Sequence, residues 1–174
     1  RTLTATYEYD AFDRRISRVD ATTRVRTEYV YDGESVVEEF ADGLPERTHV
    51  GSTRSQDDGV IKTFTWVQAA GPVWHHLDEE GSVIALSDNA GSVIERYAYD
   101  DFGQTLILSS NGQPRAQSIV GNPHMYRGMR WDSASRFYVP ESTLCSAVYD
   151  PLTGRPTQRK KDKDAAEKTD KSEY

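Results

Sequence analysis

Cysteine, long apolar runs and positive charge are all scarce in this sequence. A single cysteine, Cys145, stands among 174 residues, which excludes an intrachain disulfide and a cysteine-based structural zinc site. No apolar run approaches the length of about 18 residues that a membrane span needs. The chain begins at Arg1 and shows no signal-peptide pattern. We therefore expect a fragment or processed product without membrane insertion.

The charge balance argues against a nucleic-acid partner. The chain has 21 Lys and Arg against 28 Asp and Glu, a formal net charge of -7 and a pI of about 5.1. Proteins that bind phosphate backbones cluster Lys and Arg on one surface, and an acidic chain gives no such footprint. We expect no nucleic-acid partner.

The carboxyl-terminal end has a different composition. From Thr157 onward the only apolar residues before Tyr174 are two alanines. Such a segment has too little apolar surface to offset the entropy of ordering it. Residues 156–174 are therefore expected to form a disordered tail. A basic patch at residues 159–161, or a linker to a further domain, is the functional alternative.

Residues 1–154 have the pattern of an all-β protein. Short runs rich in Val, Ile, Thr, Tyr and Phe are interrupted at short intervals by Gly, Asp and Asn, and no segment keeps a helical apolar period. Residues 3–9 alternate apolar and polar, which is typical of a half-buried strand. Similar strands are expected at 25–31, 35–40, 61–67, 73–77, 82–87 and 92–99.

The sequence also repeats itself. Residues 78–84, Asp-Glu-Glu-Gly-Ser-Val-Ile, recur as Asp-Asn-Ala-Gly-Ser-Val-Ile at 88–94. Each copy joins an acidic turn to a glycine, Gly81 or Gly91, and then to the start of a β-branched strand. This repeat predicts a run of antiparallel hairpins.

A second repeat pairs tyrosine with aspartate. Tyrosines two positions apart share one face of a strand, and the aspartate that follows can cap the next turn through the backbone. Stacked copies would give a ladder of packed rings. The copies are Tyr7, Tyr9 and Asp10; Tyr29, Tyr31 and Asp32; Tyr97, Tyr99 and Asp100; and, in shorter form, Tyr149 and Asp150.

These motifs resemble the RHS, or YD-repeat, family of bacterial rearrangement-hotspot proteins, wall-associated proteins, C components of Tc toxins and animal teneurins. Residues 97–103, which end in Phe102 and Gly103, are similar to the family's Tyr-x-Tyr-Asp-x-Phe-Gly element. Residues 76–103 resemble the first part of the RHS repeat-associated core. Its later motifs match Asn122, Pro123, Gly128 and Asp132, and then Tyr149, Asp150, Pro151, Gly154 and Arg155.

The resemblance implies a β-strip that spirals into a hollow shell around a carboxyl-terminal toxin or effector. We accordingly expect YD-repeat strands over residues 1–75, a core-like segment over 76–155 and the tail over 156–174. The residues of the two repeats and of the matched motifs would serve as structural positions, with no catalytic residue and no cofactor. The partners would be the rest of the shell and its cargo, and the location secreted or at the cell surface.

One departure from the family concerns self-cleavage. Many members cut themselves with paired aspartates in an Asp-Pro-x-Gly segment after the Gly-Arg motif. Here Asp162 follows instead, without a proline or glycine after it. Two carboxylates must share a proton for this chemistry, and Asp150 has no evident partner. An aspartyl self-processing core is therefore kept only as an alternative.

Other candidate sites are weaker still. His75 and His76 point to opposite faces of a strand, so the cluster with Asp78, Glu79 and Glu80 is expected to be an ordinary turn and not a metal site. Calcium on Asp78 and Glu80 lacks the ligand spacing of an EF-hand. No Gly-x-Ser-x-Gly elbow or phosphate loop is present.

Two further candidate sites involve the lone cysteine and the tryptophans. Cys145 with His124 could be a catalytic pair, but a lone cysteine in a β-rich core is more often a small buried hydrophobe. Trp66, Trp74 and Trp131 could join the tyrosines in binding a surface glycan or protein. The leading prediction is a structural segment of a shell, and a glycan- or surface-binding β-module is the other alternative.

Overall fold

The chain forms one long antiparallel sheet and one short one. The computed structural model describes residues 4–51, 60–65, 71–140 and 147–158. Eleven strands make up the long sheet, and each pairs with its neighbours in chain order. They are β1 (Ala5–Tyr9), β2 (Arg15–Asp20), β3 (Arg26–Asp32), β4 (Ser35–Ala41), β5 (Leu44–Gly51), β6 (Val60–Thr65), β7 (Pro72–Leu77), β8 (Val83–Ser87), β9 (Val93–Tyr99), β10 (Thr105–Ser109) and β11 (Pro114–Arg115).

The short sheet follows at the carboxyl-terminal side. It contains β12 (Arg130–Asp132), β13 (Phe137–Val139), β14 (Ala147–Asp150) and β15 (Arg155–Gln158), also in chain order. A single turn of 3-10 helix, η1 (Tyr126–Gly128), precedes it. No helix of the described residues is long and apolar enough to cross a membrane.

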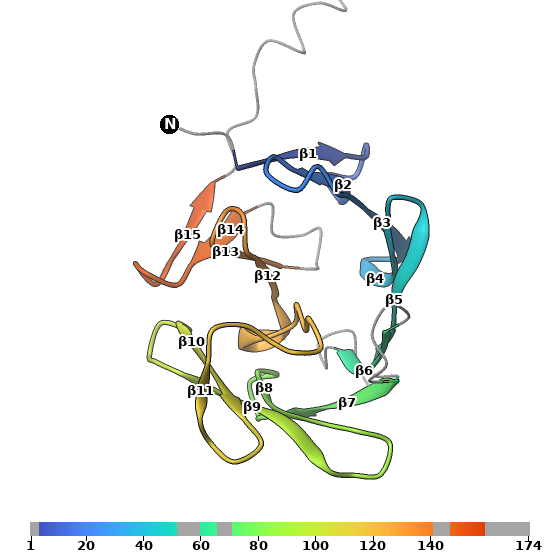
Figure 1. The fold of residues 1–174 in the computed structure, drawn as a ribbon. Coiled ribbons are helices and arrows are strands. Elements are labelled where there is room, and N and C mark those ends of the chain that lie inside the picture. Colours follow the sequence, from blue (N-terminus) through green and yellow to red (C-terminus); the bar gives the residue numbers. More distant parts are fainter. Residues whose placement is uncertain (1–3, 52–59, 66–70, 141–146, 159–174) are drawn as a thin grey trace, which may run out of the picture.

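The long sheet is strongly curved, and the curvature has a local cause. Figure 1 shows it turning from β1 to β11 around residues 116–132, which we call the enclosed segment. The pairing register shifts between Glu8 and Tyr9, Val30 and Tyr31, Glu39 and Phe40, Val50 and Gly51, His76 and Leu77, and Leu86 and Ser87. Each such bulge bends its strand and increases the local twist. Their recurrence along the sheet accounts for the curling.

The hairpins are closed by aspartates, as the repeats predict. Asp78 Oδ1 accepts hydrogen bonds from the backbone N–H groups of Glu80 (2.9 Å) and Ser82 (2.8 Å). Asp88 makes the same pair with Ala90 and Ser92 in the second copy. Gly81 and Gly91 both have a φ of +81°, a left-handed conformation that glycine adopts at little cost.

The apolar core lies between the second half of the long sheet and the enclosed segment. Its buried members are Val73, Val83, Leu86, Tyr97, Val120, Met125, Tyr126 and Tyr138. The Val83 N–H donates to the Met125 carbonyl (3.0 Å), which fixes the enclosed segment to β8. Around β2 to β7, by contrast, the buried side chains are mostly polar.

The predicted all-β class is confirmed, and the seven predicted strands lie within a few residues of β1, β3, β4, β6, β7, β8 and β9. The expected boundary between residues 75 and 76 falls inside β7, in the middle of the continuous sheet. The predicted start of the tail is wrong. Residues 156–158 belong to β15, where Pro156 pairs with Tyr149 and the Thr157 hydroxyl donates to the Val148 carbonyl (3.2 Å). Residues 159–174 lie outside the described residues.

Candidate functional site

Charged and polar side chains line the concave face of the long sheet. The alternation of a strand sends Arg15 and Ser17 of β2 to this face, and both are at most 8% exposed. Glu39 of β4, His49 of β5 and His75 of β7 occupy the same face, and each is at most 7% exposed. Buried charges persist in folded proteins only where they are paired, so their partners define the site.

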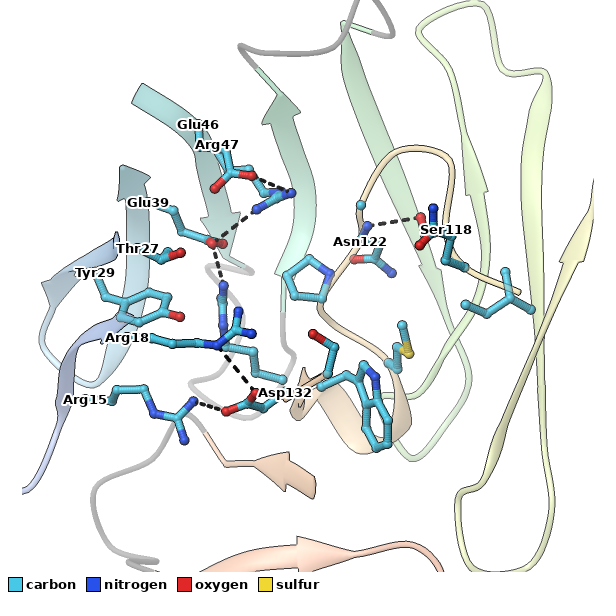
Figure 2. Close-up of a pocket in the computed structure, with 18 of the residues that line it drawn as sticks. Arg15, Arg18, Thr27, Tyr29, Glu39, Glu46, Arg47, Ser118, Asn122 and Asp132 are labelled. Carbon is cyan, nitrogen blue, oxygen red and sulfur yellow. Dashed lines mark hydrogen bonds and ion pairs between the residues drawn. The ribbon is translucent and has the colours of Figure 1, made fainter. Parts of the chain in front are cut away.

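The partners come from the enclosed segment and meet the sheet around a cavity. Figure 2 shows arginines from β2 and β5 directed toward Glu39 and Asp132 across a space of about 440 Å³. Four arginines and three carboxylates line this cavity, which leaves one positive charge in excess. The arginines are Arg15, Arg18, Arg47 and Arg130, and the carboxylates are Glu39, Glu46 and Asp132.

One buried ion pair connects β2 to β12. Arg15 Nη1 donates to Asp132 Oδ2 at 2.7 Å, and the Arg18 Nε lies 3.7 Å from Asp132 Oδ1. Burial raises the pKa of Asp132, but the charge of Arg15, the nearby Tyr7 hydroxyl and the charge of Arg18 outweigh it and hold this pKa below its usual range. Burial, followed by the nearby Asp132 charge, raises the pKa of Tyr7 to about 12. Asp132 is therefore an ionised anchor for the amino-terminal strands.

A second network centres on Glu39, whose side chain is 1% exposed. Its Oε2 accepts from Arg130 Nη2 at 2.5 Å and from Arg47 Nη1 at 3.3 Å. Its Oε1 lies 2.5 Å from His49 Nε2. Burial raises the pKa of Glu39, but the charge of Arg130 and the His49 hydrogen bond outweigh it, so this pKa lies well below its usual range.

Three histidines extend this network toward the core. The Thr63 hydroxyl lies 3.0 Å from His49 Nδ1 and 3.1 Å from His75 Nε2. The ring of His124, from the enclosed segment, lies 4.7 Å from that of His49 and 6.1 Å from that of His75, measured between centroids. Burial lowers the pKa of His49 to about 4 and that of His124 to about 3. It also lowers the pKa of His75, well below its usual range.

An aromatic seam joins the short sheet to the long one. The ring of Tyr126 lies 5.6 Å from Tyr99, 6.1 Å from Tyr138 and 5.9 Å from Tyr149. The hydroxyl of Tyr149 donates to the Phe102 carbonyl (2.9 Å), and that of Tyr138 donates to the Gly103 carbonyl (3.1 Å). The seam therefore closes the curve at the β9–β10 hairpin.

Comparison with known proteins identifies relatives in sequence. No protein-family model matches the chain. The chain is 27% identical over 154 residues to the tRNA3(Ser)-specific nuclease WapA of Bacillus spizizenii, and 26% identical over 159 residues to the tRNA nuclease WapA of Bacillus subtilis. Each match covers 86% of this chain and only 6% of the relative.

Solved structures of similar architecture include Tc toxin assemblies. A crystal structure of TcdB2-TccC3-Cdc42 matches 87% of this chain and 7% of its own chain with a TM-score of 0.63 at 17% identity. The Photorhabdus luminescens Tc holotoxin pore matches 91% and 8%, with a TM-score of 0.58 at 14% identity. The protein has an RHS-like fold.

Within this RHS-like fold, the motif residues Tyr7, Tyr29 and Tyr97 face the interior, and most of the motif aspartates cap turns. Tyr29 and Tyr97 are buried, and the Arg130 and Arg15 guanidinium groups lie over the rings of Tyr29 and Tyr7, at 4.8 and 4.2 Å from the centroids. Asp10, Asp100 and Asp150 each accept a backbone hydrogen bond from the residue two positions on. Asp32 instead ends β3 opposite Ser35, at a turn where Gly33 has a φ of +59°.

The later motif residues hold the enclosed segment and the seam in place. Asn122 donates to the His124 carbonyl (2.6 Å) and accepts from the His124 N–H. Pro123 accepts a hydrogen bond from the Trp131 N–H (2.7 Å). Gly154 approaches Phe102 so closely that a Cβ there would lie 2.6 Å from the ring. The remaining motif residues lie on or next to regular elements: Tyr9 on β1, Tyr31 on β3, Gly128 in η1, Pro151 directly after β14 and Arg155 on β15.

The sequence motifs missed the charged residues that face this interior. Arg15, Glu39, His49 and Arg130 stand in no repeat, and Glu39 follows another glutamate on a strand with a bulge. Glu95 was missed as well. It is fully buried and accepts from Tyr97 (2.7 Å), from Ser118 (2.8 Å) and from the Ile119 N–H (2.5 Å). Only the two-residue alternation of each strand could have indicated such positions.

Among the described residues, two groups with catalytic potential are buried or hold a turn. The Thr63 hydroxyl contacts two imidazoles, which is a way to activate a nucleophile, but Thr63 is only 3% exposed. The carboxylate of Asp150 caps its own turn through Leu152 and Thr153. No group of three or more potential metal ligands occurs among the described residues. Trp66 and Cys145 lie outside those residues, so the Cys145–His124 pair is not tested.

Proposed function

We propose that this chain is a non-catalytic structural segment of a YD-repeat β-shell, in a bacterial secreted or cell-surface protein, that encloses or presents a carboxyl-terminal toxin or effector. One observation carries the proposal: the inner face of the curved sheet is occupied by buried ion pairs to the enclosed segment, Arg15 with Asp132 and Arg130 with Glu39. These charged side chains thereby connect the curved sheet to the enclosed segment and are not available for catalysis.

The relatives support a toxin-type cargo. The WapA proteins are tRNA nucleases by name, yet the matched stretch is only 6% of their length. We assign the nuclease activity of such a protein to another part of its chain. Among the described residues, the buried carboxylates Glu39 and Asp132 of the wall and the enclosed segment are already paired with arginines, and that arrangement suits a container better than an active site.

The sheet edges support a strip that continues beyond this chain on the amino-terminal side. Strand β1 is an edge strand of the long sheet, because it pairs with β2 on one side only. An unprotected edge is a template for another strand. The edge strand of the short sheet, β15, is less receptive, because its Pro156 has no N–H to donate. A preceding YD repeat would therefore add at β1.

Light scattering behind a sizing column, over a concentration series, tests this proposal on the 174-residue chain. Unsatisfied β1 groups should make the average mass rise with concentration above the 19.6 kDa of one chain. Ala5→Pro, which removes an N–H that β1 directs away from β2, should reduce this association. A monomer at every concentration would contradict a shell segment and favour a self-contained binding module.

Three further readouts address the alternatives. Incubation with tRNA should leave the tRNA intact, and the intact mass of the chain should stay constant over days. Cleavage of tRNA that is lost in a His49→Gln variant would contradict the non-catalytic proposal. A cut near Asp150 would instead establish the aspartyl self-processing alternative. Glycan binding that is lost in Trp74→Ala would favour the binding module.

A further inference from the structure

The interior holds a cluster of titratable groups that the structural role alone does not require. Of the four histidines in the chain, three face the interior: His49 from β5, His75 from β7 and His124 from the enclosed segment. They are 4%, 7% and 1% exposed. The cluster therefore spans the contact between the wall and the segment that the wall encloses.

Neutral rings satisfy the hydrogen bonds of His49 and His75. The ionised Glu39 carboxylate accepts from His49 Nε2, so a neutral His49 must accept at Nδ1 from the Thr63 hydroxyl. The same hydroxyl oxygen then accepts from His75 Nε2. This assignment leaves His75 Nδ1 without a proton, and that buried atom has no hydrogen-bond partner among the described residues. A proton added at His49 Nδ1 would force the Thr63 hydroxyl to turn, and one added at His75 Nδ1 would find no acceptor among the described residues.

The surrounding charges also oppose protonation. One carboxylate, Glu39, faces two guanidinium groups, Arg47 and Arg130. Arg47 is also paired with Glu46 at 3.0 Å, so these four charges balance and leave no carboxylate in excess to neutralise a protonated histidine. The only other imidazole that bears on the cluster, His76, lies on the outer face of β7 and bonds to Ser87 (2.8 Å). Each protonation would therefore add a positive charge beside another in a site of low polarity.

The direction of the pH effect follows from linkage. The pKa values of all three imidazoles are lowered in the closed structure, to about 4 for His49 and about 3 for His124. An imidazole exposed by opening regains a pKa of about 6.5. Opening therefore takes up protons, so the closed state is fully favoured above pH 6.5 and loses its advantage as the pH falls. For His49 alone, the opening constant should be about 20-fold larger at pH 5 than at pH 7.

We propose that His49, His75 and His124 form an acid-sensitive latch, the histidine latch, that holds the enclosed segment against β4 to β7 at neutral pH and releases it on mild acidification. The latch depends only on the interior of this chain, so it can be tested independently of the shell assignment. It would give an acidic compartment or surface a means of opening the fold.

Hydrogen–deuterium exchange of the 174-residue chain between pH 7.5 and 4.5, corrected for the intrinsic exchange rate, tests the latch. We expect peptides from the enclosed segment and from β7 to lose protection below pH 6.5. With three histidines titrating, the logarithm of the opening constant should rise by up to about three per pH unit. Protection that persists to pH 4.5 would overturn the proposal.

Matched variants separate the latch from general acid denaturation. His75→Gln and His124→Gln each remove one titrating group, so each should lower the slope by about one. His76→Gln alters the neighbouring residue on the opposite face of the same strand and should leave the slope unchanged. Equal slopes for His75→Gln and the unsubstituted chain, or an equal effect of His76→Gln, would overturn the latch.

A second measurement covers the case in which a variant fails to fold. In the unsubstituted chain, imidazole NMR signals report the protonation of each histidine directly. We expect three of the four to keep neutral chemical shifts until the chain opens, and then to titrate together with the loss of structure. Protonation of any of these three in the closed state above pH 5.5 would contradict the proposal.

Discussion

Some motif residues in this fold are required because of the space around them as much as because of their chemistry. Gly103 ends the Tyr-x-Tyr-Asp-x-Phe-Gly element with a φ of +85°. A Cβ at this position would lie 2.5 Å from Cδ1 of Tyr126, a buried ring of the aromatic seam. The glycine is thus needed twice, for its left-handed backbone and for the ring that crosses it.

Gly103→Ala should therefore be much more harmful than a glycine replacement in open space. Left-handed strain costs about 1–2 kcal/mol and overpacking about 1–3 kcal/mol, so we expect a loss of about 2–5 kcal/mol in the free energy of unfolding. Gly112→Ala is the control, because its φ is +82° but nothing lies within 4 Å of the added Cβ. It should lose about 1–2 kcal/mol in the same urea titration. Equal losses would show that Tyr126 moves aside.

The buried pair of Arg15 and Asp132 should behave differently from an exposed one. Asp132→Asn leaves the Arg15 charge in an interior where its own side chain is only 8% exposed, and removing one partner of a buried pair costs about 3–5 kcal/mol. Glu80→Gln breaks the pair with Arg127, whose side chain is 54% exposed, and should cost less than about 1 kcal/mol.

Urea titration of both variants checks this prediction. A small effect of Asp132→Asn would show that water reaches the pair through the adjacent cavity. Combining Asp132→Asn with Arg15→Met should recover part of the loss, because it removes the uncompensated charge.

At the scale of elements, the sequence predicted strands where alternation or repetition was clear. The copies at 78–84 and 88–94 were recognisable because each residue type has a distinct role: the aspartate caps the turn, the glycine adopts its left-handed conformation and the β-branched residue begins the strand. Strand β2 was missed because its sequence, Arg-Ile-Ser-Arg-Val-Asp, places arginine and serine on the buried face. The sequence alone does not say that Asp132, 117 residues away, will neutralise Arg15.

The site was less predictable than the strands for the same reason. The repeats identified Tyr29 and Tyr97, whose rings are buried, but Glu39 and His49 gained a role only when the curled sheet met the enclosed segment. The local sequence pattern predicts the burial of apolar side chains well. It predicts a buried charge poorly, because the partner that makes burial tolerable comes from a distant strand.

The strand β15 leads to a prediction about the carboxyl terminus. A chain that ends at Gln158 should keep the melting temperature of the full chain, since residues 159–174 have almost no apolar side chains to bury. A chain that ends at Gly154 loses β15 and its pairing with β14. Its melting temperature should fall by about 5–10 °C, from the loss of several backbone hydrogen bonds. An equal fall in both truncations would give the last residues a structural role.

At the scale of the whole molecule, two regions that look distinct in sequence are joined into one sheet. The expected boundary between the YD repeats and the core-like segment falls inside β7, and ion pairs link β2 and β4 to the enclosed segment. The amino-terminal strands thus obtain the partners of their buried charges from the carboxyl-terminal half. Neither half has a complete interior without the other.

The chain should therefore unfold in a single step. Far-UV circular dichroism, which follows all strands, and tryptophan fluorescence, which includes the signal of Trp131 at the edge of the cavity, should give coincident urea transitions with the same midpoint. Asp132→Asn should shift both curves to lower urea together. Two separated transitions would show that residues 1–75 and 76–155 are independent units. The charge network would then fasten two domains that fold separately, and a break in it would let one half open while the other remained folded.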